Sequence, residues 1–214
     1  MARLPAQALA RISVVVALAF LLVHAHGALA VRPATVEPSP EELTRERQAL
    51  YRIEPDARGG EAYKLVYLVP APLKVFWRFK TDFNNDFLLG HKFIKEHRFI
   101  GQQGNVVITE DIYTSAPGKV LRWRTTIYPT RHRLEFVLDN PKECDQRFHY
   151  GFIQLEPFGE AETKVTHVAY FDFLGASLWA NYPWPGGMSS FLRYTARWEQ
   201  ETIVRLRGKY DEHP

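Results

Sequence analysis

Apolar and polar residues alternate along most of the chain between residues 61 and 174. The first such run, EAYKLVYLV at residues 61–69, is rich in the β-branched and aromatic residues that favour strands, and Pro70 and Pro72 end it. Six further runs of this kind follow, at residues 92–100, 105–113, 119–128, 131–138, 146–156 and 163–174. Because the connections between them are short, the pattern predicts antiparallel neighbours and a sheet of seven strands.

Three other segments repeat their apolar residues at helical spacing. Ser39 and Pro40 are suited to begin a helix, which is predicted over residues 41–52. Residues 73–89 carry apolar side chains at three- and four-residue steps, which predicts one helix or two short ones. A long C-terminal helix is predicted over residues 189–209, with Glu199 off its apolar face. That face consists of Phe191, Tyr194, Thr195, Trp198, Thr202 and Leu206.

This order of elements is typical of an α+β protein with a single curved sheet. An antiparallel sheet of seven strands twists strongly and curls, so its concave face needs a cover. The C-terminal helix is the only long amphipathic element that the sequence offers for this purpose. We therefore predict a helix-grip domain over residues 61–210, preceded by a linker and short helix at residues 31–60.

The first 30 residues have the features of a secretory signal peptide. Arg3 and Arg11 lie before a run of twelve apolar residues at 12–23. Ala-Leu-Ala at residues 28–30 is a suitable cleavage site for a signal peptidase. The run is shorter than the roughly 20 apolar residues that cross a bilayer. Cleavage after Ala30 would give a periplasmic or secreted protein, and an uncleaved membrane anchor is the alternative interpretation.

Charge and cysteine content narrow the classes of function. The chain has 27 basic and 24 acidic residues, and removal of Arg3 and Arg11 would leave 25 basic ones, a net charge of about +1. This near-balance argues against nucleic-acid binding, which requires a basic surface. The single cysteine, Cys144, cannot form an internal disulfide. Stability must therefore come from the core, and 46% hydrophobic residues suffice to build one.

The chain resembles the START-like, or SRPBCC, superfamily, which includes birch-pollen-allergen-like proteins, lipid-transfer START domains and polyketide cyclase/dehydrase-like proteins. The resemblance lies in VPAPLKVFW at residues 69–77, TKVTHVAY at residues 163–170 and the terminal helix, and covers about residues 61–210. The extension at residues 31–60 departs from the minimal family pattern. The resemblance implies an apolar cavity that holds a lipid, sterol, polyketide or similar ligand, and it fits a carrier and an enzyme equally.

Strand alternation selects the candidates for chemistry in such a cavity. In the last strand, His167 is the single polar residue of an apolar row. It is interpreted as a general base or a donor to a ligand, or else as a core histidine bonded to a carbonyl or tyrosine. Glu110 lies between Ile108 and Ile112 in another apolar row, where it would pair with His167 or bend outward. Tyr170 is the third catalytic candidate.

Aromatic residues near the same cavity are the candidates for ligand contact. Trp123 belongs to the apolar row of its strand, and the loop at residues 179–187 is rich in aromatic residues and proline. This loop is predicted to gate the cavity mouth, by touching a ligand or transiently a membrane, or else to plug the core. The predicted contact set is His167, Phe171, Trp123, Trp179, Tyr182, Trp184, Tyr194 and Trp198.

The sequence contains no metal-binding, phosphate-binding, dinucleotide or serine-hydrolase motif, so no metal or cofactor is predicted. The leading hypothesis is binding or transport of an apolar, lipid-like small molecule outside the cytoplasm. A cyclase/dehydratase- or hydrolase-like enzyme and a protein-interaction module with a filled core are the alternatives. Ligand identity and oligomeric state stay open.

Overall fold

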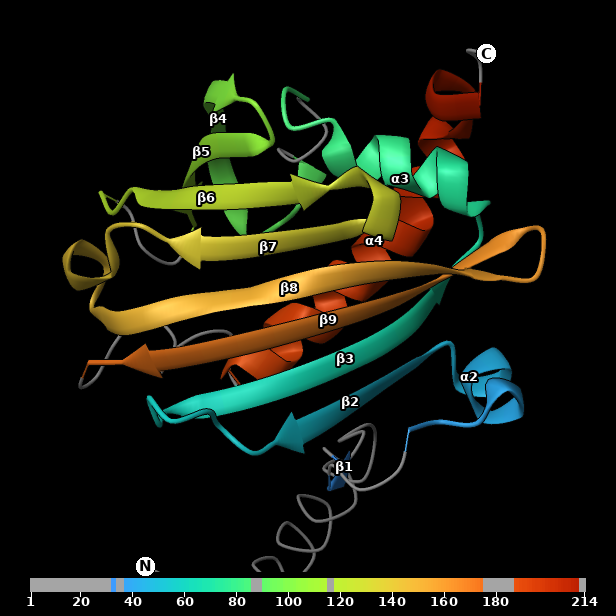
Figure 1. The fold of residues 1–214 in the computed structure, drawn as a ribbon, viewed down its shortest axis with the longest axis horizontal. Helices are drawn as coiled ribbons and strands as arrows, with labels where there is room; N and C mark the ends of the chain where they lie inside the picture. The colour runs from blue at the N-terminus through green and yellow to red at the C-terminus, as the bar shows by residue number, and fades with distance from the viewer. Residues whose placement is uncertain (1–31, 34–36, 86–89, 115–117, 175–186, 212–214) are drawn as a thin grey trace, which may run out of the picture. The chain divides into compact units, whose positions relative to one another are not determined.

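The computed structural model describes residues 32–33, 37–85, 90–114, 118–174 and 187–211, and it places a curved sheet against a long helix (Figure 1). The strands are β1 (Arg32–Pro33), β2 (Gln48–Ile53), β3 (Glu61–Val69), β4 (Ile94–Gln103), β5 (Val106–Tyr113), β6 (Leu121–Tyr128), β7 (Arg133–Leu138), β8 (Gln146–Phe158) and β9 (Glu162–Phe173). The helices are α2 (Pro40–Glu46), α3 (Leu73–Thr81) and α4 (Gly187–Asp211), with short 3-10 turns η2 (Pro129–Arg131) and η3 (Pro141–Cys144).

The predicted α+β helix-grip architecture is confirmed, but the sheet is wider than expected. Its order is β1-β2-β3-β9-β8-β7-β6-β5-β4, which makes nine strands among the described residues instead of seven. The strands from β2 to β9 pair with antiparallel neighbours, and only the two-residue β1 pairs parallel, with β2. In Figure 1, α4 crosses one face of this sheet with α3 beside it.

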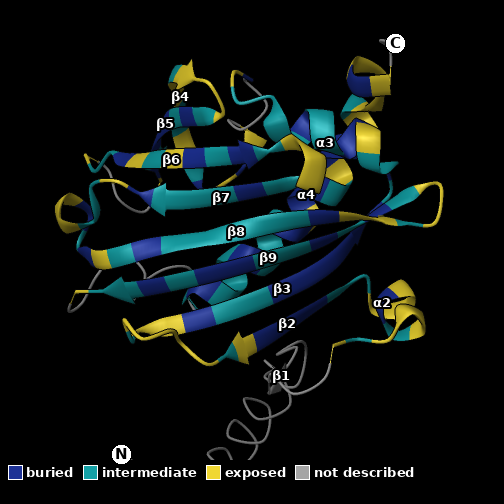
Figure 2. Cartoon of the chain, viewed as in Figure 1, coloured by how far each residue is buried: buried dark blue, intermediate teal, exposed yellow. Residues whose placement is uncertain are grey.

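The additional strand β2 replaces the second half of a predicted helix. Helix α2 ends at Glu46, because Arg47 adopts a left-handed conformation (φ 64°) and its N–H bonds to the carbonyl of Leu43. The next residues pair with β3, which puts Leu50 opposite Leu65. The few apolar residues of the predicted helix thus belong to a short helix and a strand. Figure 2 shows much of β2 and β3 as buried.

The other strands lie close to their predicted places. Strand β3 begins and ends at residues 61 and 69, as predicted, while β4 starts two residues later and ends three residues later than predicted. Helix α3 ends at Thr81, and residues 86–89 of the predicted helical segment lie outside the described residues. Both β3 and α3 are fixed by local signals, because Pro70 and Pro72 end the strand and start the helix.

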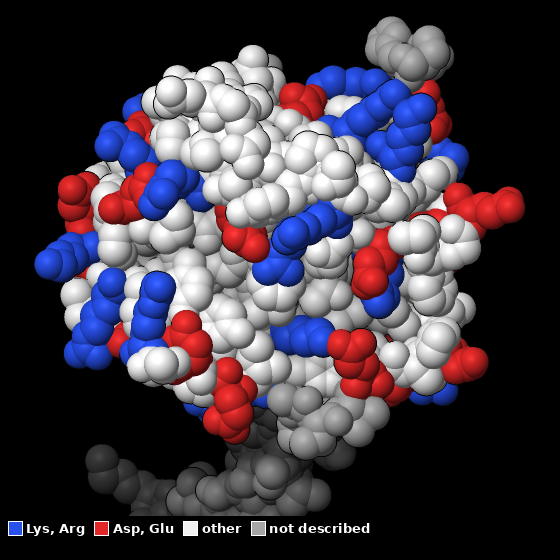
Figure 3. Space-filling view, viewed as in Figure 1, with Lys and Arg blue, Asp and Glu red and all other residues white. Residues whose placement is uncertain are grey.

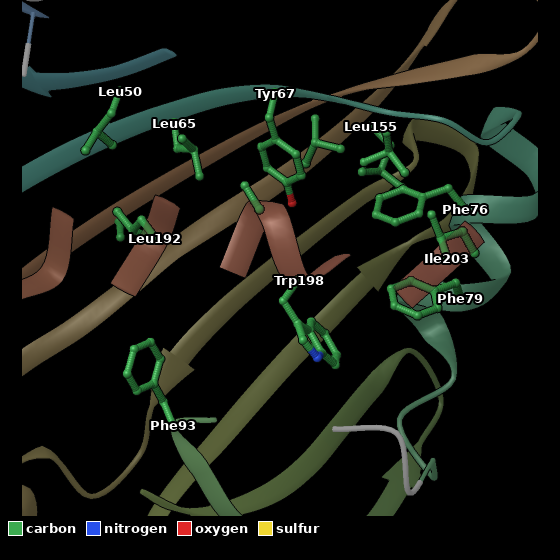
Figure 4. Close-up of a cluster of buried hydrophobic side chains, with 14 of the residues drawn as sticks. Leu50, Leu65, Tyr67, Phe76, Phe79, Phe93, Leu155, Leu192, Trp198 and Ile203 are labelled. Atoms are coloured by element: carbon green, nitrogen blue, oxygen red, sulfur yellow. The ribbon is translucent and has the colours of Figure 1, made fainter. Parts of the chain in front are cut away.

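The main core lies between α3, α4 and the concave face of the sheet. Figure 4 shows Leu50, Leu65 and Tyr67 facing α4, with Phe76 and Phe79 of α3 beside it. Trp198 and Thr202 of the predicted row are buried, and the other buried positions of α4 lie about one residue away from that row. They include Leu192, Ala196, Glu199 and Ile203. Helical spacing alone would put Glu199 on the apolar face, and only its charge argues against burial; in the fold its carboxylate has the buried partners Tyr67 and Lys80.

Gly151 of β8 lies too close to the β9 backbone and to the Phe136 ring to accommodate a side chain. A Cβ at this position would lie 2.0 Å from the Val168 carbonyl oxygen and 2.8 Å from Cζ of Phe136. We expect Gly151→Ala to lower the free energy of unfolding by about 1–3 kcal/mol, because backbone and ring must both move. Urea unfolding measures the loss. Gly101→Ala in β4 is the matched control, because its Cβ would meet nothing within 4 Å, and equal stability of the two variants would contradict the prediction.

Candidate functional site

A cavity of about 230 Å³ lies between the concave face of the sheet and α4. Apolar and aromatic side chains from β4 to β9 and from α4 form the larger part of its wall. Its polar members include four histidines, His91, His97, His149 and His167. The other polar residues of the wall are threonines of β5, β6 and α4 and three charged residues, Lys80, Asp111 and Glu199. The volume is slightly below the usual range for small-molecule sites, about 300–1,000 Å³.

Three of the predicted contact residues, Trp123, His167 and Trp198, line this cavity. Phe171 lies in the main core, stacked on Tyr63 with ring centroids 5.9 Å apart. Tyr194 packs against His91 and Phe93 with centroids 5.0 and 4.8 Å away, and is absent from the wall that the described residues form. Trp179, Tyr182 and Trp184, with most of the predicted gating loop, lie outside the described residues.

Glu110 and Tyr170 lie on the outer face of the sheet and not beside His167. The cavity-facing row of β5 contains Thr109, Asp111 and Tyr113, so the predicted row of Ile108, Glu110 and Ile112 faces the other way. Two further contacts fix these side chains outside: the Arg122 guanidinium donates to Glu110 at 2.6 and 2.9 Å, and Tyr170 stacks on Tyr150.

The inner and outer rows of β5 are the reverse of the prediction, because this part of the concave face lines a cavity. The alternation rule selects the more aliphatic row as the inner one, which holds only where the inner face is packed core. The outer face of the sheet carries Lys and Arg interspersed with Asp and Glu (Figure 3). The Glu110–Arg122 pair is an ordinary member of this charged surface.

His167 and His149 are neutral imidazoles in an aromatic environment. Burial lowers the pKa of each to about 3. The ring of His149 packs edge-on against Trp123 at 4.9 Å, and its Nδ1 is buried without a hydrogen-bond partner among the described residues. The ring of His167 packs edge-on against Phe136 at 5.5 Å. His167 therefore occupies its predicted place in the wall, while its role stays a prediction.

The hydrogen bonds around His91 fix its tautomer. The Thr195 hydroxyl donates to the Phe191 carbonyl at 2.9 Å, so its oxygen accepts from Nε2–H of His91 at 3.2 Å. Nδ1 of His91 is then an unprotonated acceptor, buried and without a partner among the described residues. Burial, followed by the charges of Lys92 and Lys80, lowers the pKa of His91 to about 4. His91 is thus neutral at physiological pH.

His97 and Asp111 form a buried acid–base pair at the cavity wall. They occupy paired positions of β4 and β5, and His97 Nδ1 lies 2.7 Å from Asp111 Oδ1. His97 Nε2 lies 2.9 Å from the Phe83 carbonyl oxygen. Burial raises the pKa of Asp111 more than the bond to His97 lowers it. Burial alone would lower the pKa of His97, but the Asp111 and Phe83 hydrogen bonds and the Asp111 charge together raise it.

A second charged pair crosses from α3 to α4. The Lys80 ammonium donates to Glu199 Oε1 at 2.6 Å, and the Tyr67 hydroxyl donates to Oε2 of the same carboxylate. Figure 4 shows the Tyr67 hydroxyl pointing towards α4. Burial, followed by the Glu199 charge, raises the pKa of Tyr67 well above its ordinary value, so this hydroxyl remains a donor. Both Lys80 and Glu199 line the cavity, where their charges cancel.

Comparison with known proteins bears on the fold. No family model and no curated protein matches the chain. The structure is similar to the Zhui aromatase/cyclase from Streptomyces sp. R1128, with TM-score 0.56, 11% identity, and coverage of 68% of this chain and 94% of that one. It is also similar to norcoclaurine synthase from Thalictrum flavum, with TM-score 0.50, 10% identity, and coverage of 83% and 98%. The chain therefore has a START/SRPBCC-like helix-grip fold.

Proposed function

We propose that the protein binds a compact, largely apolar small molecule in the cavity between the sheet and α4. The cavity of about 230 Å³ carries this proposal, because an apolar wall supplies affinity by burial while a few polar groups orient the ligand. Its size favours a ring system or short chain over a long acyl chain. The cavity also speaks against the alternative of an interaction module with a filled interior.

The structural neighbours support a ring-bearing occupant. One solved complex of the Thalictrum norcoclaurine synthase holds dopamine and hydroxybenzaldehyde, with TM-score 0.50 to this chain at 10% identity. Both molecules are single-ring aromatics of the size that the cavity favours. The alternative of a cyclase/dehydratase- or hydrolase-like enzyme would have to use residues other than Glu110 and Tyr170, because these two lie on the opposite face of the sheet from His167.

Transport of a lipid-like molecule outside the cytoplasm is the finer version of this proposal. The apolar wall supports the first part, and the signal-peptide pattern of residues 1–30 supports the second. Within the described residues, no helix has the length and apolar character that crossing a membrane requires. Native mass spectrometry of the purified protein, followed by denaturation to release any passenger, tests for a bound small molecule. An empty protein that also takes up nothing from a mixed lipid extract would count against transport.

Filling the cavity is expected to weaken binding strongly without unfolding the protein. Thr125 of β6 is buried and lines the cavity, so Thr125→Phe would place a ring inside it. We expect at least about a ten-fold loss of affinity for 2-methoxynaphthalene, measured by calorimetry.

Thr126→Phe is the matched control, because Thr126 is the next residue of the same strand and points to the other face. Its affinity should equal that of the unmodified protein. Equal affinity of Thr125→Phe and Thr126→Phe would show that the probe binds elsewhere.

A further inference from the structure

The β5–β6 side of the cavity carries oxygen atoms that the protein itself leaves unpaired. Asp111, Thr109 and Thr125 all line the cavity. Asp111 uses Oδ1 for its contact with His97, and within the described residues no donor contacts its Oδ2. The two threonine hydroxyls likewise have no partner in that part of the chain. An apolar ligand would leave all of these oxygens desolvated, which is costly for a carboxylate above all.

His97 fixes both the position and the charge of Asp111. A carbonyl oxygen only accepts hydrogen bonds, so the contact with Phe83 requires a proton on Nε2 of His97. The contact between Nδ1 and Oδ1 then holds one further proton, which sits on either atom. The pair is an imidazolium with a carboxylate in one case and a neutral imidazole with a carboxylic acid in the other. It is uncharged overall in both, and Oδ2 is a hydrogen-bond acceptor in both.

The surroundings of this pair favour an uncharged ligand with a donor group. The only other charged groups of the described wall, Lys80 and Glu199, neutralise each other. An anion would face the acceptor oxygen of Asp111, and a cation would find no net negative charge to balance it. A hydroxyl or N–H group satisfies Oδ2 at no electrostatic cost.

We propose that Asp111 Oδ2 is the polar anchor of the cavity and selects an uncharged ring molecule that carries a hydroxyl or N–H donor. This rests on the proposed binding function and names its ligand class. His97 is a positioning residue. Its two ring nitrogens already contact Asp111 and the Phe83 carbonyl, so it holds Asp111 in place and has no nitrogen left to bond the ligand. Thr109 and Thr125 flank the anchor on β5 and on the neighbouring strand β6, where they can bond further polar groups of the same ligand.

The test compares 2-naphthol with 2-methoxynaphthalene, which has the same rings but no donor. By calorimetry at neutral pH, we expect the protein to bind 2-naphthol at least about ten-fold more tightly, because 2-methoxynaphthalene leaves Oδ2 without a donor. Asp111→Leu is expected to remove this preference and leave the affinity for 2-methoxynaphthalene within about three-fold. Asp111→Asn should retain the preference, because its amide can donate to His97 and still present an oxygen to the cavity.

Glu110→Leu is the matched control, since this carboxylate is the next residue along β5 and faces outward. It should leave the preference unchanged. Equal binding of the two probes by the unmodified protein would overturn the anchor while leaving the binding function intact. If Asp111→Leu does not fold, this comparison of the two probes alone tests the anchor. A preference that persists in Asp111→Leu would also overturn it. Failure to bind either probe would overturn the binding function together with the anchor.

Discussion

Lowering the pH from 7 to 5 is expected to reduce the free energy of unfolding by about 4 kcal/mol through His91 and His149 alone. Burial holds the pKa of these side chains at about 4 and about 3 in the folded protein, against 6.5 when unfolded. Between pH 6.5 and pH 4 the unfolded chain therefore binds more protons than the folded one. Stability falls as the pH falls through this window, by about 2 kcal/mol for each histidine at pH 5.

Three other cavity groups modify this acid response. His167 acts in the same direction, since burial also lowers its pKa to about 3, and water in the cavity would reduce its contribution. His97 and Asp111 act in the opposite direction. Both have raised pKa values in the folded protein, so their protonation stabilises the folded state as the pH falls.

Urea unfolding at pH 7, 6 and 5 measures the effect. His149→Phe should remove about 2 kcal/mol of the acid loss, because a phenyl ring suits the site among Trp123, Phe136 and Phe173 and has no proton to bind. Tyr150→Phe is the control at the next, outward-facing residue, and the stability difference between pH 7 and 5 should stay unchanged in it. Equal stability of the unmodified protein at pH 7 and 5 would show that the histidines are charged, and hence hydrated, in the folded state.

Glu199→Ala is expected to lower the free energy of unfolding by about 3–5 kcal/mol, because it leaves the buried Lys80 ammonium without its partner. Glu199 is 3% exposed and the side chain of Lys80 only 14%, so water cannot readily replace the lost carboxylate. The Tyr67 hydroxyl, which is fully enclosed in the core, also loses its acceptor. Removal of a charge from a paired buried site costs far more than the pair itself contributes, since the remaining charge keeps its desolvation penalty.

A double variant distinguishes this cause from simple loss of packing. Combining Glu199→Leu with Lys80→Met should cost much less than the sum of the two single changes, because neither charge is then left alone. Asp211→Ala is the control on the same helix, where an exposed Arg207–Asp211 pair contributes at most about 0.5 kcal/mol. A loss of less than 1 kcal/mol in Glu199→Ala would mean that Lys80 reaches water through the cavity.

The local sequence pattern determined which segments form the strands β3 to β9, where α3 starts and that a long helix covers the sheet. Period-two alternation, the two prolines at residues 70 and 72 and the helical repeat of the C-terminal segment are properties of neighbouring residues, and each survives into the fold. The place of His167 in the cavity wall follows from the same alternation, because its row on β9 packs inward along its whole length.

The pairing of His97 with Asp111 was decided by the tertiary structure. Gln103 and Val106 close the turn between β4 and β5, and counting outward from them without interruption would place Ile112 opposite His97. A bulge between Phe99 and Gly101 shifts the register by one residue and brings Asp111 there instead. Gly101 is the one local sign of a bulge here, but it does not tell which residues then pair. The burial of Glu199 was likewise decided by the tertiary structure. Its charge is buried beside Lys80 and Tyr67, which are distant in sequence and meet it only when α4 packs against the sheet.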